Sequence, residues 1–437
     1  MKKVLIVTYY WPPAGGPGVQ RILKFAKYLP QFGWQPIILT VKKGEFPSYD
    51  ISLSKDIPDE CIVIKTKSFE PNLFYKKWIG LKKNDPLPMA LVAEKKQNWR
   101  KRISVWIRIN FFLPDAKILW KFFAVRKGRN IISKFAPDLI ISSSPPPTVH
   151  LIAQSLHKSS RIPWIADFRD PWTDIYHFDD INKTYIVKKI ENKMEQDVIN
   201  NCNLVITVSE HFKKIFEEKT KDKTKFRIIT NGFDTSDFNK IKYNKSPKFT
   251  LAYSGKLSAK QNPLKLWEGI SNFIQEHPEI KKTFQISLTG KFDSTVHTSI
   301  KNNNLQNIFV DNGYVSHEEA IKNILKADVL IIIIPDTKKN KGILPGKLFE
   351  YMAAERYIIG IGPEDSDMAT ILKETNSGIV LPFFANFTPI IKELYYKWER
   401  KKQLSLTNKK EINKYSRFEL TKSLASEMDV ISSERQP

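Results

Sequence analysis

The chain has 437 residues, more than one ordinary hydrophobic core accommodates, so we expect two or three domains. With 41% hydrophobic and 12% aromatic residues, the composition is that of a globular protein and excludes a disordered chain. The 70 Lys and Arg against 46 Asp and Glu give a formal net charge of +24, which favours a polyanionic partner, either nucleic acid or an anionic membrane.

The first residues, MKKVLIVTYYWPP, combine two lysines with an apolar run, but no small-residue cleavage site follows. We therefore expect a buried strand there and not a signal peptide. The longest apolar run, residues 329–335, is too short to cross a bilayer. Cys61 and Cys202 are the only cysteines, which excludes a disulfide framework and fits a reducing compartment. Together these features predict a soluble, cytoplasmic protein.

A glycine-rich turn follows the first predicted strand. Gly15, Gly16 and Gly18 lead into a helical pattern, and backbone N–H groups at such a helix start bind anions. The glycine spacing differs from the dinucleotide fingerprint, and the second strand ends in Lys42 and Lys43, where a nicotinamide enzyme needs an acid for the ribose. The turn therefore argues against a dehydrogenase; an ordinary strand-to-helix turn is the alternative.

Residues 95–129 form a basic segment with eleven Lys and Arg and one acid, Asp115. Basic and aromatic side chains mixed at helical spacing are typical of a helix in a membrane interface. An amphipathic helix with a solvated basic face is the alternative, whereas nucleic-acid binding is disfavoured because no zinc spacing or other recognised module accompanies the segment. The interleaved apolar side chains are Trp99, Trp106, Ile107, Phe111, Phe112, Leu113, Trp120, Phe122 and Phe123.

The sequence IADFRDPW places Asp167, Arg169 and Asp170 directly after a predicted strand. A carboxylate at such an edge is suited to orient or deprotonate an attacking hydroxyl, and Arg169 is suited to bind a phosphate. The structural alternative is that Asp170 caps a turn and pairs with Arg169. His150 is a further catalytic candidate, although a histidine at a predicted helix start also serves structural roles.

Short apolar runs alternate with helical patterns through most of the chain, which predicts parallel sheets covered by helices on both faces. The periodicity lapses in a lysine-rich stretch, residues 234–248, and then resumes. We therefore expect two similar doubly wound domains, residues 1–240 and 249–400, and a C-terminal helix, residues 411–437, that packs back on the first. Ligands bind at the carboxyl ends of parallel strands, so the predicted site lies in the cleft between the domains.

Two stretches of the second domain suggest an anion site. Lys256 and Lys260 bracket the loop after its first strand and are placed to stabilise a diphosphate leaving group, unless both are simply solvated. In GILPGKLFEYMAAE, Lys347 and Glu350 are three residues apart and share one helix face. Lys347 is either a further cationic contact or only the helix partner of Glu350. The acidic stretch at residues 364–367 is expected to cap a helix and not to bind a metal.

In order along the chain, YYWPPAGGPGVQR, ITNGFDTSDF, YSGKLSAKQNPLKLWEGI and GYVSHEEAIKNILKADVLIIIIP resemble motifs of the retaining nucleotide-sugar glycosyltransferases of glycosyltransferase family four. This resemblance implies the GT-B fold, an α/β fold of two doubly wound Rossmann-like domains facing across a cleft. FFLPDAKILW, ISSSPPPTVHLIA and PWIADFRDPW are similar to segments of bacterial cell-surface polysaccharide glycosyltransferases.

The resemblance also implies site roles and the absence of a metal or other cofactor, because lysines neutralise the leaving nucleoside diphosphate. One departure concerns Gly342, which stands where the family has the first of two glutamates and leaves the sugar contact to backbone N–H groups of residues 343–346. The implied donor contacts are Gly15 and Gly16 near the phosphates or reacting centre, Lys256 and Lys260 on the diphosphate, the backbone around Tyr314 and Val315 on the base, Gly346 on phosphate or sugar, and Glu350 on the ribose.

These observations predict an enzyme at the cytoplasmic face of the membrane that moves a sugar, with retention, from a nucleotide donor to a lipid-linked or saccharide acceptor. The expected partners are the nucleotide sugar, the acceptor and an anionic membrane surface, and not nucleic acid. The alternatives are a nucleotide-sugar epimerase of the same fold, which needs further acid/base carboxylates at the sugar, and a non-catalytic membrane-binding protein. The sugar, base, acceptor and linkage do not follow from the residues.

Overall fold

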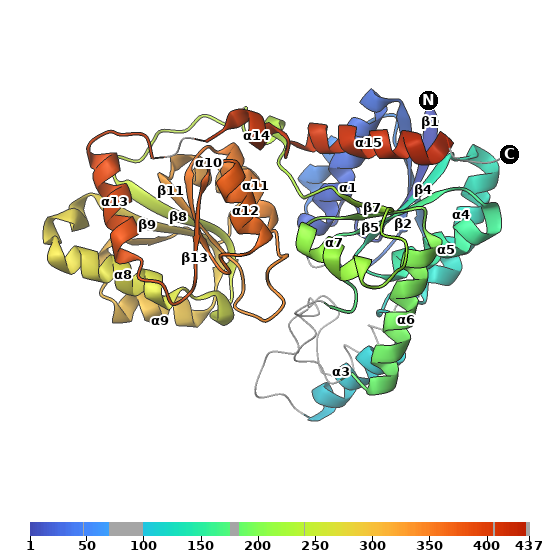
Figure 1. The fold of residues 1–437 in the computed structure, drawn as a ribbon, viewed down its shortest axis with the longest axis horizontal. Coiled ribbons are helices and arrows are strands. Elements are labelled where there is room, and N and C mark those ends of the chain that lie inside the picture. Colours follow the sequence, from blue (N-terminus) through green and yellow to red (C-terminus); the bar gives the residue numbers. More distant parts are fainter. Residues whose placement is uncertain (47, 70–98, 175–182, 240, 405–406, 434–437) are drawn as a thin grey trace. The chain divides into compact units, whose positions relative to one another are not determined.

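The computed structural model describes residues 1–437 except 47, 70–98, 175–182, 240, 405–406 and 434–437 (Figure 1). The chain divides into two compact units, Met1–Thr230 with Leu420–Pro437, and Asn231–Glu419. No described helix combines the length and the apolar character needed to cross a membrane.

The first unit is built on a parallel sheet of seven strands, in which β1 pairs with β2 and β4. Along the sheet the order is β3 (Ile62–Thr66), β2 (Trp34–Val41), β1 (Lys2–Val7), β4 (Leu139–Ser144), β5 (Trp164–Phe168), β6 (Leu204–Thr207) and β7 (Phe226–Ile228). The inner strands β1, β4, β5 and β6 are almost wholly buried, so they are mostly apolar runs in the sequence, whereas the edge strands β3 and β7 are partly exposed.

Helices cover both faces of this sheet (Figure 1). The C-terminal helix α15 begins in the second unit and contributes Leu424, Ala425 and Met428 to the first unit's core, beside Val4 and Ile22. The helices are α1 (Pro17–Tyr28), α3 (Trp99–Phe111), α4 (Trp120–Phe135), α5 (Thr148–Ser160), α6 (Tyr185–Asn201), α7 (Glu210–Glu217) and α15 (Arg417–Ser433).

A buried ion pair crosses the centre of the first unit. The guanidinium of Arg21, on α1, donates through Nε and Nη2 to the two carboxylate oxygens of Asp167, on β5, at 3.0 and 2.7 Å. Ser143, on β4, donates to the same carboxylate at 2.6 Å, and Arg21 also donates to the carbonyl oxygens of Ile229 and Thr230 at 2.8 and 2.7 Å. This network fixes α1, two strands and the end of the unit's main segment together.

The second unit repeats the architecture with a parallel sheet of six strands. Their order is β10 (Phe309–Asp311), β9 (Phe284–Phe292), β8 (Phe249–Leu257), β11 (Val329–Ile333), β12 (Tyr357–Ile361) and β13 (Gly378–Leu381). The helices are α8 (Leu264–Glu276), α9 (Ser294–Asn302), α10 (His317–Lys326), α11 (Gly346–Ala353), α12 (Asp367–Glu374), α13 (Thr388–Glu399) and α14 (Lys409–Asn413). The predicted parallel α/β architecture is confirmed.

The second unit begins earlier than residue 249, the start that the sequence suggested. Phe233 packs in its core, its N–H donates to the carbonyl of Tyr415, and its carbonyl accepts from the N–H of Arg417. The acidic stretch at residues 364–367 precedes a helix, as expected, but the capping side chain is Ser366, whose hydroxyl accepts from the N–H of Ala369.

Replacing Asp167 by Asn should lower the free energy of unfolding by about 3–5 kcal/mol, because it leaves the Arg21 charge buried without its counter-ion. Burial alone would raise the pKa of Asp167, but Arg21 and Ser143 together bring it below its ordinary value. The carboxylate therefore stabilises the fold above pH about 4, and this contribution is lost as the pH falls further.

Urea unfolding at several pH values checks this, with the exposed Asp59→Asn as the matched control. A neutral-pH stability of Asp167→Asn equal to that of the control would show that the pair is not structural.

Candidate functional site

The carboxyl ends of β8 and β9 lie in unusually close contact in the second unit. Gly255 and Gly290 are register partners, and both have φ near +130°. A Cβ added at Gly290 would lie 1.9 Å from the carbonyl oxygen of Gly255, so no other residue fits without moving the strand. The sequence contains both glycines, but their pairing became visible only when the two strands were placed side by side.

Lys347, on the first turn of α11, lies against this edge of the sheet. Its Nζ is 2.6 Å from the hydroxyl of Tyr253, and that hydroxyl donates to the carbonyl of Lys256 at 2.8 Å. A Cβ at Gly255 would lie 2.6 Å from the same Nζ. Lys347 is thus held against the end of β8 and is more than a helix partner of Glu350. Burial lowers its pKa to about 7, although Glu350 opposes this effect.

Glu350 lies one turn further along α11, in a setting rich in ionisable groups. Burial raises the pKa of its carboxyl group, and the nearby Asp237 acts in the same direction, whereas His317, Lys347 and Arg417 oppose the shift. The group therefore lies among partners drawn from four segments of the unit. A carboxyl in such a place can accept hydrogen bonds from a ligand's hydroxyl groups.

The other predicted donor contacts of this unit also lie beyond the strand ends. Lys256 is the exposed penultimate residue of β8, Lys260 follows in the next turn, and Gly346 is the first residue of α11. Tyr314 and Val315 follow β10, in the loop whose Gly313 carbonyl accepts from the N–H of Gly290. Residues from four sequence stretches are therefore brought to one edge.

Sequence reasoning missed Lys291. It is the register partner of Lys256, and its Nζ lies 5.5 Å from the centre of the Tyr314 ring. Lys291 lies near the end of β9 (Phe284–Phe292), and no motif in the sequence marks it. The order of the strands was needed to place this second lysine beside the first.

The first unit carries its own polar group around the glycine turn. The N–H of Gly15 donates to the carbonyl of Ser48, and Gly16 caps α1 without a side-chain hydrogen bond. A Cβ at Gly18 would lie 3.3 Å from Nη1 of Arg169. The Nε of the same guanidinium donates to the carbonyl of Ser144 at 2.6 Å. The turn, Arg169 and the adjoining Asp170 thus gather at the carboxyl ends of β1, β4 and β5.

Two of the three catalytic candidates prove to be buried. Asp167 is 2% exposed and saturated by Arg21 and Ser143, which suits an anchor of the fold and not a base for an attacking hydroxyl. His150 is fully buried and stacks on Phe168, with ring centres 4.2 Å apart. Burial lowers its pKa to about 3 against the opposing influence of Asp167, so it is neutral at physiological pH. Asp170 is the one candidate among these carboxylates that is partly exposed.

Burial also lowers the pKa of Arg169, an effect that Asp167 and Asp170 oppose. Its Nε is already engaged by the carbonyl of Ser144, so a phosphate would meet the remaining guanidinium N–H groups.

The basic segment, residues 95–129, is not one helix. Residues 95–98 lie outside the described part, and the remainder forms α3 and the start of α4 with a connection between them. Trp120 is buried and donates through Nε1 to Thr66 at 2.8 Å, so it belongs to the core and cannot contact a membrane. Trp106, Phe111 and Phe122 are exposed.

The described residues contain no group of three His, Cys, Asp or Glu side chains arranged to hold a metal ion. The positive groups at the second unit's sheet edge are instead lysines, and these are suited to bind a diphosphate directly.

Comparison with solved structures identifies the fold. A glycosyltransferase from Rickettsia africae ESF-5 is 15% identical with a TM-score of 0.62, covering 100% of this chain and 99% of that one. Anabaena Alr3699/HepE in complex with UDP-glucose is 12% identical with a TM-score of 0.61, covering 98% and 100%. The lipopolysaccharide outer core galactosyltransferase WaaB is 12% identical with a TM-score of 0.57, covering 98% and 99%. The chain therefore has the GT-B fold.

No curated protein sequence matched the chain. The model of the family described as Glycosyltransferase Family 4 matches residues 18–237, half of the sequence. The glycine turn, Arg169 and Asp170 all lie within or beside that match. The protein is a glycosyltransferase and belongs to glycosyltransferase family four.

Proposed function

We propose that the protein transfers a sugar from a nucleoside diphosphate donor to a hydroxyl of a lipid-linked or saccharide acceptor in the synthesis of a cell-surface polysaccharide. The observation that carries this proposal is the arrangement of Lys347 and Glu350 on α11 against the paired glycines of β8 and β9. One edge of the sheet then offers cations for a diphosphate and a carboxyl group for a ribose, which are the two parts shared by every such donor.

In the proposed complex, Lys256, Lys260 and Lys347 bind the diphosphate, and Glu350 accepts hydrogen bonds from the ribose hydroxyls. The backbone around Tyr314 and Val315 contacts the base. Gly346 offers its N–H to the phosphate or sugar where the family's first glutamate is absent at Gly342. Lysine charge stabilises the leaving nucleoside diphosphate as the glycosidic bond breaks.

On the acceptor side, we assign Asp170 to orient the attacking hydroxyl and Arg169 to bind an acceptor or donor phosphate. Asp167 and His150 then act only by shaping this edge of the sheet, because neither side chain is exposed. Retention follows from the resemblance to the family: the hydroxyl attacks the face from which the diphosphate leaves, and its proton passes to the departing phosphate oxygen.

We place the enzyme at the cytoplasmic face of the membrane as a peripheral protein, since a lipid-linked acceptor resides there. Its net charge of +24 and the exposed aromatic side chains of α3 support this location. UDP-glucose is the first donor to test, because a structure of the same fold was solved with it bound.

A thermal-shift screen against a panel of nucleotide sugars should single out the donor, since a ligand that binds only the native state raises Tm. Lys256→Ala and Glu350→Ala should each weaken donor binding about 10- to 100-fold by removing a charge-assisted hydrogen bond. Lys282→Ala and Glu268→Ala, both exposed and away from the strand ends, are the matched controls.

Transfer to a saccharide acceptor, and not epimerisation of the donor sugar, is the expected reaction, which product analysis distinguishes. Unchanged donor binding in both site variants would refute the proposed site, and an epimerised donor without transfer would favour the alternative enzyme.

Donor binding should also depend on pH through Lys347. Its pKa of about 7 leaves the amine charged below neutrality and increasingly neutral above it, so binding of the diphosphate at higher pH requires uptake of a proton. We expect the affinity for UDP to fall up to about tenfold per pH unit above pH 7. Calorimetry in buffers of different ionisation enthalpy measures this proton uptake.

The variant Lys347→Met should bind UDP more weakly and with a flat pH profile between pH 7 and 8.5. Equal slopes in the two proteins would mean that another group is responsible.

A further inference from the structure

The end of the first unit formed by α3 and the start of α6 exposes large apolar side chains from both helices. We define the α3–α6 face by these side chains together with Lys188 and Lys189. The apolar members are Trp106 (43% exposed) and Phe111 (70%) on α3, and Tyr185 (80%), Ile186 (68%) and Ile190 (43%) on α6.

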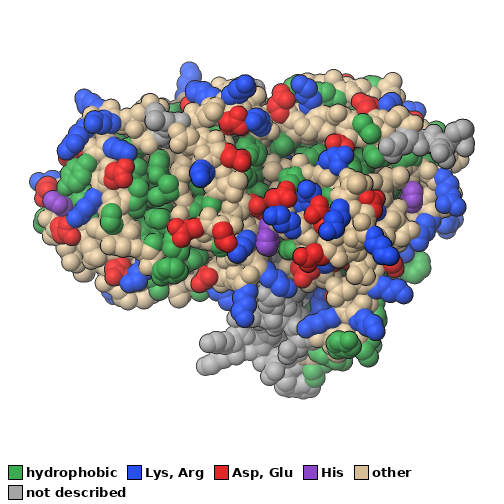
Figure 2. Space-filling view, viewed as in Figure 1, with side chains coloured by type: hydrophobic (Ala, Val, Ile, Leu, Met, Phe, Trp, Pro, Cys, Tyr) green, Lys and Arg blue, Asp and Glu red, His purple; other side chains and the backbone are tan. Residues whose placement is uncertain are grey.

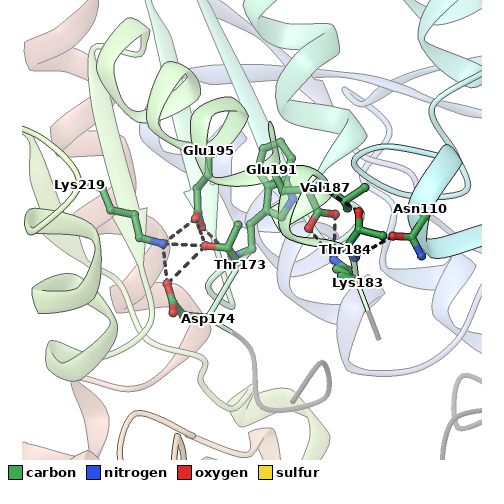
Figure 3. Close-up of polar contacts among 10 residues, drawn as sticks. Asn110, Thr173, Asp174, Lys183, Thr184, Val187, Glu191, Glu195 and Lys219 are labelled. Atoms are coloured by element: carbon green, nitrogen blue, oxygen red, sulfur yellow. Dashed lines mark hydrogen bonds and ion pairs between the residues drawn. The ribbon is translucent and has the colours of Figure 1, made fainter. Parts of the chain in front are cut away.

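The two helices are joined by Asn110. Its side-chain oxygen accepts from the N–H of Thr184, the N-cap of α6, at 3.0 Å (Figure 3). Its amide donates to the carbonyl of Trp106 at 2.9 Å. Thr184 in turn caps α6 by accepting from the N–H of Val187. The side chain that holds the first turn of α6 therefore comes from the last turn of α3, and the two helices lie next to each other (Figure 1).

The acids of this part of α6 point inward. Glu191 is 2% exposed and binds the Lys183 ammonium at 2.6 and 2.8 Å, while Glu195 is fully buried and binds Lys219 at 2.6 Å. Glu195 also accepts from the N–H of Trp172 (Figure 3). Both carboxylates thus face the interior and are paired with cations there.

The outer side of the same turns is consequently cationic and apolar. Lys188, Lys189 and Lys193 are exposed, and α3 has no Asp or Glu in its sequence. Figure 2 shows basic and hydrophobic side chains next to one another at the lower end of the first unit. Sequence periodicity alone suggested the basic segment, residues 95–129, but gave no reason to include α6, where Glu191 and Glu195 alternate with the lysines.

We infer that the α3–α6 face docks on an anionic lipid bilayer, with Trp106, Phe111, Tyr185 and Ile186 entering the interface and Lys188 and Lys189 contacting lipid phosphates. Interfacial aromatic residues beside exposed lysines are the chemistry that such a surface selects. Among the described residues of α6, the acids nearest to Lys188 and Lys189 are the buried Glu191 and Glu195. A surface that binds another protein does not require lysines on one side only, whereas a surface that binds an anionic bilayer does. The inference rests on the membrane location in the proposed function and assigns six residues that carry it, four of which lie outside the basic segment.

Vesicle flotation of the full chain tests the face. The protein should float with phosphatidylcholine vesicles that contain phosphatidylglycerol and remain below with phosphatidylcholine alone. Lys188→Glu with Lys189→Glu should reduce the bound fraction about tenfold or more, and Ile186→Ser should reduce it several-fold. The matched controls are Lys281→Glu with Lys282→Glu, an exposed lysine pair in the second unit, and Leu264→Ser, another exposed aliphatic residue.

The thermal shift of each variant with UDP-glucose is measured in parallel, together with sedimentation velocity. Loss of flotation with an unchanged donor shift supports the inference. Equal flotation of the α6 variants and their controls overturns it while leaving the proposed enzyme in place. A change in self-association without vesicle binding also overturns it and assigns the face to contact between copies. If the protein floats with vesicles but UDP-glucose does not change its Tm, the membrane surface is supported and the proposed donor is not.

Discussion

The ion pair between Arg21 and Asp167 is the constraint on which the first unit depends. A guanidinium and a carboxylate are taken wholly out of water, so each requires the other and the hydrogen bonds around them. Because the partners come from α1, β4, β5 and the carbonyls of Ile229 and Thr230, satisfying one charge fixes all of these segments. The glycine turn lies at the start of α1, and Arg169 and Asp170 directly follow β5. The network around Arg21 and Asp167 therefore also fixes the positions of these residues.

The second unit also contains a largely buried charged group, the ammonium of Lys347. Lys347 is pressed against Tyr253 and the backbone of Gly255, where burial lowers its pKa, yet it remains beside the partly exposed end of the sheet. A cation that is destabilised in the empty protein gains most from an incoming anion, because the ligand supplies the counter-charge that the protein withholds. In both places a charge is removed from water, which costs free energy. Arg21 and Asp167 offset this cost for each other, whereas in the proposed diphosphate site the bound substrate would offset it for Lys347.

Charge is sorted in the same way on α6. Glu191 and Glu195 are paired with lysines toward the interior, whereas Lys188 and Lys189 are exposed on the outside of the same turns; an exposed acid, Asp197, follows further along the helix. The high net charge of the chain therefore becomes a local, one-sided feature at the α3–α6 face. Whether an acid neutralises a surface lysine depends on the side of the helix that each occupies and on what packs against that side. The amino-acid composition gives no information on either point.

The sequence by itself determined the alternation of strands and helices and the two doubly wound units, because these depend on local periodicity. It also supplied Lys256, Lys347 and Glu350 as candidate donor contacts, which stay a prediction. Only the tertiary structure decided that Asp167 and His150 are buried, that Trp120 is core, and that Lys291 lies beside Lys256. These outcomes depend on the order of strands in a sheet and on contacts between residues far apart in the chain. The sequence predicts that a residue directly after a strand lies at the carboxyl end of the sheet. Whether that residue is solvated or paired depends on the residues that are near it in space, which the sequence does not give.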